Sequence, residues 1–339
     1  MSRLESAPPP AAPAVVPGPS VPLSASALGD AARAVCRQDP DLPLPGRGAT
    51  RARWRALAAI AARDVCLVKV LEAHYDARAI LAELGGALPA PDRLLAVWAA
   101  EPPDARLEFT QRADGTGTVS GRKAWCSGAA LVDAALVTAH AGDARVLVCV
   151  DMRQPGVVPD GDDWHAVGMA RVHSGSVRFD DAPAVRIGDA GAYLARPGFW
   201  HGGAGIAACW FGAATAIAET LRRHPGLEHQ AHAAAHLGAI DTALHAAAAL
   251  LRETADAIDA QPDAPHVEAV MRVRSLLERT ATDVIDRVGR ALGPGPLCAD
   301  AAHAQRCADL ATFIRQSHAE RDWAAIGRAA GTRSVGWAL

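Results

Sequence analysis

An aromatic residue and a hydroxyl residue at close spacing, Trp125 and Ser127, are the first candidates for chemistry in this sequence. The segment that contains them is predicted to be a strand, in which residues two apart share one face of a sheet. An indole beside a hydroxyl offers a flat surface and a hydrogen-bond donor to a planar ring that carries nitrogen and oxygen atoms. The alternative interpretation is a core tryptophan beside a strand serine satisfied by the backbone.

A glycine-rich turn provides a second candidate site. Gly293 and Gly295 flank Pro294 after a predicted helix. Such a turn exposes backbone N–H groups and allows a pyrophosphate to approach closely. The alternative is a simple helix stop. His229, His232 and His236 share one helix face at a spacing that suits a metal, but no fourth ligand is evident, so we predict no metal site.

Composition excludes several classes of protein. The 339 residues carry 34 Lys and Arg against 37 Asp and Glu, a net charge of −3. That balance excludes a chain built mainly to neutralise nucleic-acid phosphates. The seven cysteines are scattered without a CxxC pair, as expected of reduced thiols. No uninterrupted apolar run reaches the roughly 18 residues of a bilayer span, and no secretory pattern is visible. We therefore expect a cytoplasmic protein that binds neither membrane nor nucleic acid.

Hydrophobic periodicity divides the chain into four segments. Proline crowds residues 1–46, which predicts a poorly ordered arm with a short Ala-rich turn near 24–38. Residues 47–93 have helical spacing, and residues 94–190 form short apolar runs bounded by turns, typical of an antiparallel β barrel or sandwich. Residues 191–339 return to helical spacing and predict a four-helix bundle. Its helices are expected near 200–223, 227–259, 264–291 and 301–329. This order has no βαβ alternation, which excludes a doubly wound nucleotide fold.

Five fragments in order resemble the flavin-dependent acyl-CoA dehydrogenase family. One fragment, residues 121–139, contains GRKAWCSGA at 121–129 and VDAALVTA at 132–139, which are similar to its Gly-x-Lys-x-Trp-x-Ser strand and to the strand that follows. The other fragments are Glu-Pro at 101–102, GMARVHSGSVRFDD at 168–181, Glu-His-Gln at 228–230 and LGPG at 292–295. They fall where that family has a Glu-Pro pair, a Gly-x-Arg strand, a Glu-His-Gln helix start and a glycine turn. The resemblance covers roughly residues 65–330.

The resemblance implies a fold and a cofactor. The fold would consist of N-terminal helices, a central antiparallel β barrel or sandwich and a C-terminal four-helix bundle, with FAD bound. Trp125 would pack against the flavin ring, and Ser127 would hydrogen-bond near its reactive nitrogen. Gly293 and Gly295, assisted by Gln230, would contact the diphosphate of FAD held by a neighbouring subunit. A homodimer or homotetramer is therefore implied.

The catalytic base is the largest departure from the family. Dehydrogenation of an acyl thioester requires a carboxylate to remove the α-proton while the flavin accepts the β-hydride. The two positions that carry the family's glutamate correspond to Gln316 and Gly202, and neither can take a proton. His201 adjoins the second position, and His318 and Glu320 lie beside the first. We consider all three as candidates for proton transfer, because imidazole and carboxylate suit acid–base work; structural or cofactor-positioning roles are the alternative.

The expected function is therefore an FAD-dependent oxidoreductase that acts on the CH–CH group of an acyl-CoA or related acyl thioester with a non-standard base. Electron-transfer flavoprotein is a candidate electron acceptor. One alternative is a flavin-dependent monooxygenase on the same fold, which needs no α-proton base. Another alternative is a non-catalytic oligomeric protein that has lost redox activity.

Overall fold

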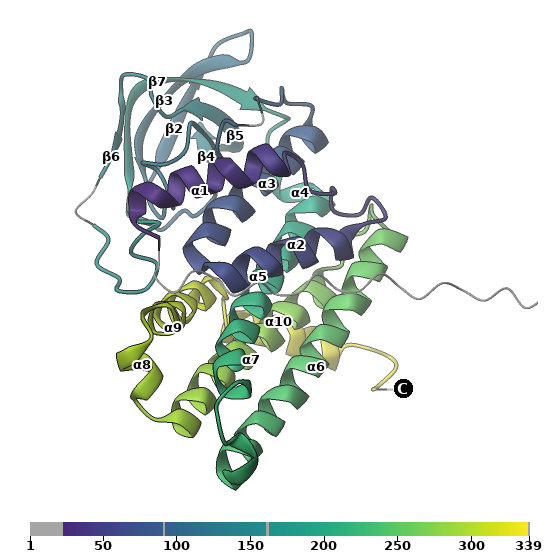
Figure 1. Ribbon diagram of the computed structural model, residues 1–339. Helices are drawn as coiled ribbons and strands as arrows, with labels where there is room; N and C mark the ends of the chain where they lie inside the picture. Colours follow the sequence, from purple (N-terminus) through teal and green to yellow (C-terminus); the bar gives the residue numbers. More distant parts are fainter. Residues whose placement is uncertain (1–22, 91, 161–162, 338–339) are drawn as a thin grey trace, which may run out of the picture.

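The computed structural model describes residues 23–90, 92–160 and 163–337. A seven-stranded sheet lies at one end of the molecule and the C-terminal helices lie at the other (Figure 1). Three N-terminal helices lie between these two parts and pack against both. One large cluster of buried apolar side chains runs through all three regions, so the sheet and the helices share a core.

The N-terminal helices are α1 (Ala25–Gln38), α2 (Thr50–Arg63) and α3 (Val65–Leu84). Helix α1 lies within the segment predicted to be a poorly ordered arm. The Ser24 hydroxyl caps it by accepting from the Ala27 N–H at 3.2 Å, and no proline interrupts it. Its apolar face buries three small or aliphatic side chains, Leu28, Ala32 and Cys36. Residues 1–22 of the predicted poorly ordered segment lie outside the described residues.

The sheet is mixed, which corrects the expected antiparallel arrangement. Its strands are β1 (Leu95–Trp98), β2 (Leu107–Gln111), β3 (Thr116–Lys123), β4 (Ala134–Ala141), β5 (Ala144–Asp151), β6 (Val157–Pro159) and β7 (Val177–Ile187). The order is β1-β4-β2-β3-β7-β5, and a further pairing of β4 with β5 closes a ring. Strands β1 and β2 run parallel to β4, whereas the other pairings are antiparallel. Alternating apolar residues predict a strand but not the direction of its partner.

The C-terminal helices include four long ones. These are α5 (Pro197–Arg222), α6 (Ala231–Ala260), α7 (Val267–Leu292) and α9 (Ala301–Phe313). Shorter elements are α4 (Ala192–Ala195), α8 (Gly295–Ala299), α10 (Glu320–Gly331) and 3-10 turns at Leu227–His229 and Ile314–Gln316.

The single helix expected near 301–329 is broken into α9 and α10. Ala319 adopts φ +42°, outside the helical region, and its N–H donates to the Ser317 hydroxyl at 3.2 Å. Arg274 of α7 donates to the Gln316 carbonyl at 3.0 Å. Neither glycine nor proline marks this break. Contacts with another helix stabilise it, so the local sequence did not reveal it.

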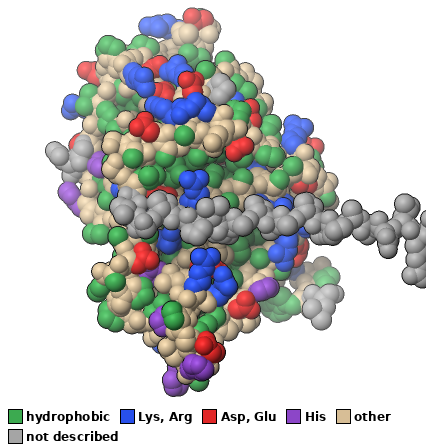
Figure 2. All heavy atoms as spheres, in the orientation of Figure 1, with side chains coloured by type: hydrophobic (Ala, Val, Ile, Leu, Met, Phe, Trp, Pro, Cys, Tyr) green, Lys and Arg blue, Asp and Glu red, His purple; other side chains and the backbone are tan. Residues whose placement is uncertain are grey.

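Two helices, α5 and α6, are long and apolar enough to cross a membrane by length and composition alone, despite interruptions by glycine and histidine. Helix α5 is mostly buried, so its apolar character serves the protein core. A Cβ atom at Gly212 would lie only 2.0 Å from the Ala58 carbonyl oxygen, so glycine permits close packing of α5 on α2. Helix α6 is mostly exposed. Figure 2 shows hydrophobic side chains across the middle of one face and charged side chains over the sheet end.

Candidate active site

The loop after β3 exposes an aromatic side chain. Strand β3 ends at Lys123, so Trp125 and Ser127 lie on a loop and not on the expected strand. Trp125 adopts φ +60°, a region that bulky residues rarely occupy, and 58% of its surface is exposed. The neighbouring Cys126 is fully buried, and its N–H donates to the Gly175 carbonyl at 2.7 Å. A strained, exposed indole beside a firmly anchored residue is typical of a binding surface and excludes the core interpretation of Trp125.

The Ser127 hydroxyl lies 2.7 Å from the Ser174 hydroxyl. Two hydroxyl groups carry two protons, and only one of these is needed for their mutual hydrogen bond. The other proton is available to an acceptor outside the pair. The Ser127 carbonyl accepts from Nε1 of Trp98 at 3.2 Å, which connects this loop to the end of β1.

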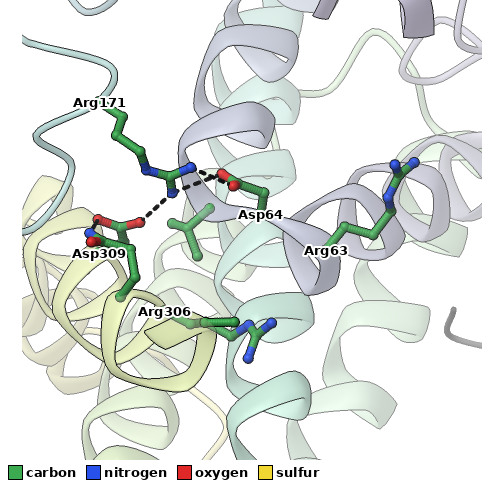
Figure 3. Close-up of a pocket in the computed structure, with 8 residues that line it drawn as sticks. Arg63, Asp64, Arg171, Arg306 and Asp309 are labelled. Carbon is green, nitrogen blue, oxygen red and sulfur yellow. Dashed lines mark hydrogen bonds and ion pairs between the residues drawn. The ribbon is translucent and has the colours of Figure 1, made fainter. Parts of the chain in front are cut away.

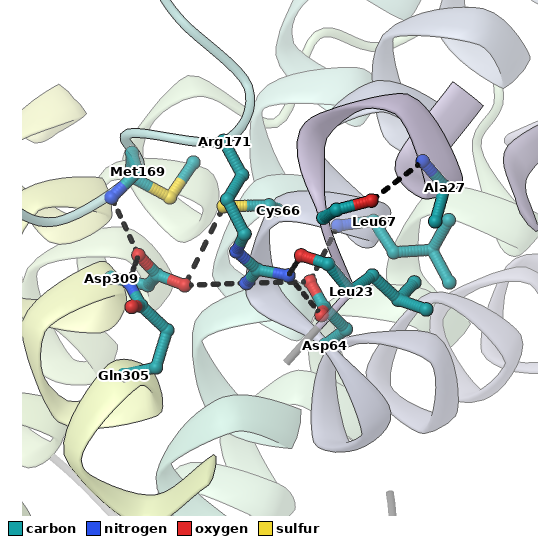
Figure 4. A network of polar contacts seen from close by, with 10 residues as sticks. Leu23, Ala27, Asp64, Cys66, Leu67, Met169, Arg171, Gln305 and Asp309 are labelled. Carbon is teal, nitrogen blue, oxygen red and sulfur yellow. Dashed lines mark hydrogen bonds and ion pairs between the residues drawn. The ribbon is translucent and has the colours of Figure 1, made fainter. Parts of the chain in front are cut away.

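The loop that carries Ser174 is held in place by a partly buried arginine. Arg171 donates to Asp64 at 2.6 Å and to Asp309 at 2.9 Å, as Figure 4 shows. Asp309 also accepts from the Met169 N–H at 2.6 Å. The small cavity beside these residues, drawn in Figure 3, measures about 20 Å³ and has room for a single water molecule. This cluster therefore positions the loop and is too small to bind a substrate.

The Glu-Pro and Gly-x-Lys fragments meet in one ionic network. Lys123 donates to the carbonyl and hydroxyl oxygens of Thr138 at 2.8 and 2.7 Å and lies 3.6 Å from Glu101. Burial lowers the pKa of Lys123 to about 8, while Glu101 opposes that change. Glu101 also pairs with Arg145 at 2.7 Å. These contacts fix the chain just beyond β1 against β3 and β4.

A cavity of about 540 Å³ lies among α3, α5, α7, α10 and the end of β1. Its apolar wall includes Val97, Ala99, Phe199, Trp200, Ile206 and Met271. Its polar groups include Lys69, Glu72, Asp76, Arg274, His318 and Asp322. A volume of several hundred cubic ångströms suits a small organic molecule. The combination of an aromatic wall and several titratable groups is typical of a catalytic cavity.

Two of these polar groups are firmly engaged. Glu72 pairs with Lys69, and burial is the main cause that raises the pKa of Glu72. Arg274 donates to the Gly203 carbonyl at 2.7 Å, and its guanidinium lies 5.0 Å from the centre of the Trp210 ring. These contacts make both groups part of the cavity wall.

Of the three proton-transfer candidates, His318 lines this cavity. Its Nδ1 lies 3.6 Å from Asp322, and partial burial is the main cause that lowers its pKa, so the imidazole is neutral at pH 7. Glu320 is exposed at the first position of α10 and is not among the residues that line the cavity. His201 donates through Nε2 to the Ala264 carbonyl at 2.9 Å and lines a separate cavity of about 190 Å³. The structure does not bring these three residues together.

Asp76 is a cavity residue that the sequence analysis missed. It lies one turn after Glu72 on α3 and also lines the cavity. Two carboxylates four residues apart on a largely apolar helix are the signal that could have revealed it, because i and i+4 side chains share a helix face.

The remaining predicted cofactor residues lie on the helical half of the molecule. Gln230 is exposed immediately before α6. Gly293 ends α7 with φ +63°, and Gly295 begins α8, which lies among the C-terminal helices and away from the sheet (Figure 1). No cluster of metal ligands occurs among the described residues.

The loop residues fit a flavin ring. Trp125 offers an exposed indole surface, and the Ser127–Ser174 pair has a hydroxyl proton to spare. Nε1 of Trp164, whose ring centre lies 6.3 Å from that of Trp125, is buried and has no hydrogen-bond partner among the described residues. A buried donor without a partner is rare in native proteins and is consistent with an absent acceptor.

Comparison with known proteins identifies the fold. No family model and no curated protein sequence matches the chain. Glutaryl-CoA dehydrogenase from Mycobacterium smegmatis superposes with a TM-score of 0.76 at 18% identity, over 93% of this chain and 90% of that chain. FMN-bound TdsC from Paenibacillus sp. A11-2, a dibenzothiophene monooxygenase, gives 0.71 at 19% identity, over 90% and 95%. KijD3 in complex with FMN and a dTDP-sugar gives 0.70 at 18% identity, over 91% and 92%.

The chain has the fold of the acyl-CoA dehydrogenases, as its sequence fragments indicated. TdsC and KijD3, which bind FMN in their structures, share this fold with the dehydrogenase, so the similarity defines the fold of this chain and specifies no substrate.

Proposed function

We propose that this chain is a flavin-dependent oxidoreductase that removes hydrogen from the α and β carbons of an acyl-CoA or a related acyl thioester. The observation that carries this proposal is that the loop after β3, which contains Trp125 and Ser127, is connected to the cavity. Trp98 donates to the Ser127 carbonyl, and its neighbours Val97 and Ala99 line the cavity. One short segment, residues 97–99, therefore contacts both the loop that would hold the ring and the space where a substrate fits.

The cofactor that we propose is FAD, which supplies a hydride acceptor when bound. Trp125 supports one face of the ring, and the spare proton of the Ser127–Ser174 pair is donated to a ring nitrogen or oxygen. The aromatic residues Phe199 and Trp200 exclude water from the reacting part of the acyl group. The α-proton must pass to a group in the cavity wall, and His318 is one candidate because it is neutral there.

A neighbouring copy of the chain would complete the cofactor site. Gly293, Gly295 and Gln230 lie on the helical half, so we assign them to the diphosphate of FAD held mainly by another subunit. Helix α6 supports this assembly, because it is apolar but mostly exposed. An apolar helix face without a covering element marks an interaction surface. We propose a homodimer or homotetramer in which each cofactor contacts two chains, with electron-transfer flavoprotein as the electron acceptor.

A flavin-dependent monooxygenase is the second candidate. One observation favours it: the two positions where the resemblance places a catalytic glutamate hold Gly202 and Gln316. The similarity to TdsC, a dibenzothiophene monooxygenase, is consistent with this alternative.

Anaerobic spectroscopy distinguishes the proposed acyl-CoA oxidoreductase from the monooxygenase and from a non-catalytic protein. We expect the purified protein to be yellow and to lose its visible absorbance when an acyl-CoA is added without oxygen. Two observations together would support the monooxygenase. The yellow protein would keep its absorbance with acyl-CoA of short, medium and long chains, and after chemical reduction it would consume oxygen in the presence of a bound aromatic substrate. A colourless protein that takes up neither FAD nor FMN would support the non-catalytic alternative.

A further inference from the structure

One carboxylate in the cavity wall has no partner among the residues that the structure describes. Among the described residues that line the cavity, Glu72 pairs with Lys69 and Asp322 lies beside His318. Within the part of the chain that the structure describes, Asp76 makes no ion pair, and its Oδ1 atom is buried without a hydrogen-bond partner. A buried carboxylate oxygen without a donor is costly, so its presence calls for a functional explanation.

A buried cation, Arg53, feels the charge of Asp76 but hydrogen-bonds to a different group. Arg53 of α2 is close enough for Asp76 to influence its pKa, which burial lowers and the Asp76 charge raises. The Arg53 guanidinium nevertheless donates to the Pro43 carbonyl at 3.3 Å. The lone pairs of Asp76 are therefore left available to a molecule in the cavity.

Helix α5 has a glycine directly opposite this carboxylate. A Cβ atom at Gly202 would lie 2.7 Å from Oδ1 of Asp76, closer than nonbonded carbon and oxygen atoms allow. Glycine in a helix interior is less favourable than alanine. This glycine gives the carboxylate of α3 the space that a side chain on α5 would otherwise fill. The position where a family glutamate was expected is thus occupied by the carboxylate of another helix.

We propose that Asp76 is the catalytic base, an assignment that rests on the proposed function. Its carboxylate accepts the α-proton of the acyl thioester, so the α C–H bond breaks and an O–H bond forms on Asp76. The electron pair of the C–H bond stays on the substrate as the enolate of the thioester. Proton removal is thereby separate from hydride transfer, and the reverse step returns a proton from Asp76 to the α carbon.

Hydrogen exchange measures this step without any redox turnover. The probe is 3,3-dimethylbutanoyl-CoA, whose β carbon carries no hydrogen, so that the holoenzyme can exchange its α-protons but cannot dehydrogenate it. In D₂O, mass spectrometry follows the replacement of the α-protons by deuterium. We expect exchange by the natural protein and a loss of about 100-fold or more in Asp76→Asn, typical of a removed general base. The exposed Asp143→Asn variant is the matched control and should exchange at the natural rate.

A second variant moves the carboxylate to the facing helix. Asp76→Ala/Gly202→Glu removes the side chain that would clash and places a carboxylate on α5. We expect it to exchange at least tenfold faster than Asp76→Ala, a difference of about 1.4 kcal/mol in activation free energy. Flavin absorbance and the affinity for the probe should be retained in all variants.

Three outcomes would overturn the assignment of Asp76. In the first, Asp76→Asn exchanges α-protons within threefold of the natural rate. In the second, Asp76→Asn loses affinity for the probe, which alone would explain slower exchange. In the third, the double variant exchanges no faster than Asp76→Ala. In each case the natural protein still exchanges and is still bleached by an acyl-CoA, so the proposed function stands. A natural protein that neither exchanges the probe nor is bleached would overturn both the function and the base.

Discussion

The hydroxyl oxygens of Ser127 and Ser174 lie 2.7 Å apart although 47 positions separate them in the chain. Each serine lies on a loop that other parts of the protein hold in place. Arg171 anchors the second loop to Asp64 on the helical side and to Asp309 of α9. The surface that we assign to the flavin ring therefore depends on ionic contacts between the barrel and the helices.

Removing this anchor should destabilise the protein. In Arg171→Leu, the Asp64 and Asp309 carboxylates, which are 6% and 1% exposed, lose their shared cation. Breaking a buried ion pair in this way typically costs about 3–5 kcal/mol. Urea unfolding should show a loss of this size in the free energy of unfolding. Arg290→Leu, which breaks an exposed pair with Asp286, is the control and should change that free energy by less than about 1 kcal/mol. Equal losses in the two variants would contradict the role of Arg171.

His74 should make the protein sensitive to acid. This imidazole is fully buried, and its Nδ1 accepts from the Leu95 N–H at 3.2 Å. Burial lowers its pKa from 6.5 to about 4. Between pH 6.5 and 4 the unfolded chain binds a proton that the folded chain does not, so the free energy of unfolding falls as the pH falls.

Between pH 6.5 and 4, His74 should lower the free energy of unfolding by about 3 kcal/mol, since one pKa unit corresponds to about 1.4 kcal/mol. Urea unfolding at several pH values measures it. His74→Asn, which retains an acceptor for the Leu95 N–H but does not titrate, should lose this part of the dependence. An unchanged slope in the variant would show that other groups cause the acid sensitivity.

Helix α6 should form a subunit interface. We expect a dimer or tetramer by analytical ultracentrifugation, and a shift to monomer in Ala249→Glu, because the charge falls on the exposed apolar helix. The same substitution at the exposed Ala113, in the turn between β2 and β3, is the control. If Gly293 and Gly295 serve a cofactor of the neighbouring subunit, the monomeric variant also binds FAD more weakly. A monomeric natural protein would contradict this interface.

The sequence revealed the order of the elements but not their long-range contacts. Helical and alternating periodicity predicted the helices and strands, and the sequence fragments indicated the fold. Parallel pairing of β1 with β4 depends on which strands meet, and no residue of β1 encodes that direction. The turn at Trp125 and the break near Ala319 are likewise stabilised by distant partners.

Some residues of the candidate site could likewise be predicted from the sequence, and others could not. Trp125 and Ser127 could be proposed from residue types at close spacing, because a ring site needs a flat surface and a donor. Asp76 could not be assigned to the cavity, since its importance depends on Gly202, which faces it from another helix. His201 and His318 looked equivalent in the sequence, yet they line separate cavities.

The central claim is that Trp125 supports a bound flavin, and titration of the protein with FAD tests it most directly. Visible absorbance and quenching of flavin fluorescence report binding in the natural protein, in Trp125→Ala and in Trp337→Ala, a control that removes an indole 93% exposed near the C-terminus. We predict that the natural protein and the control bind FAD equally, and that Trp125→Ala binds about tenfold more weakly, a loss of about 1.4 kcal/mol. A natural protein that binds neither FAD nor FMN, or a Trp125→Ala variant with unchanged affinity, would contradict the claim.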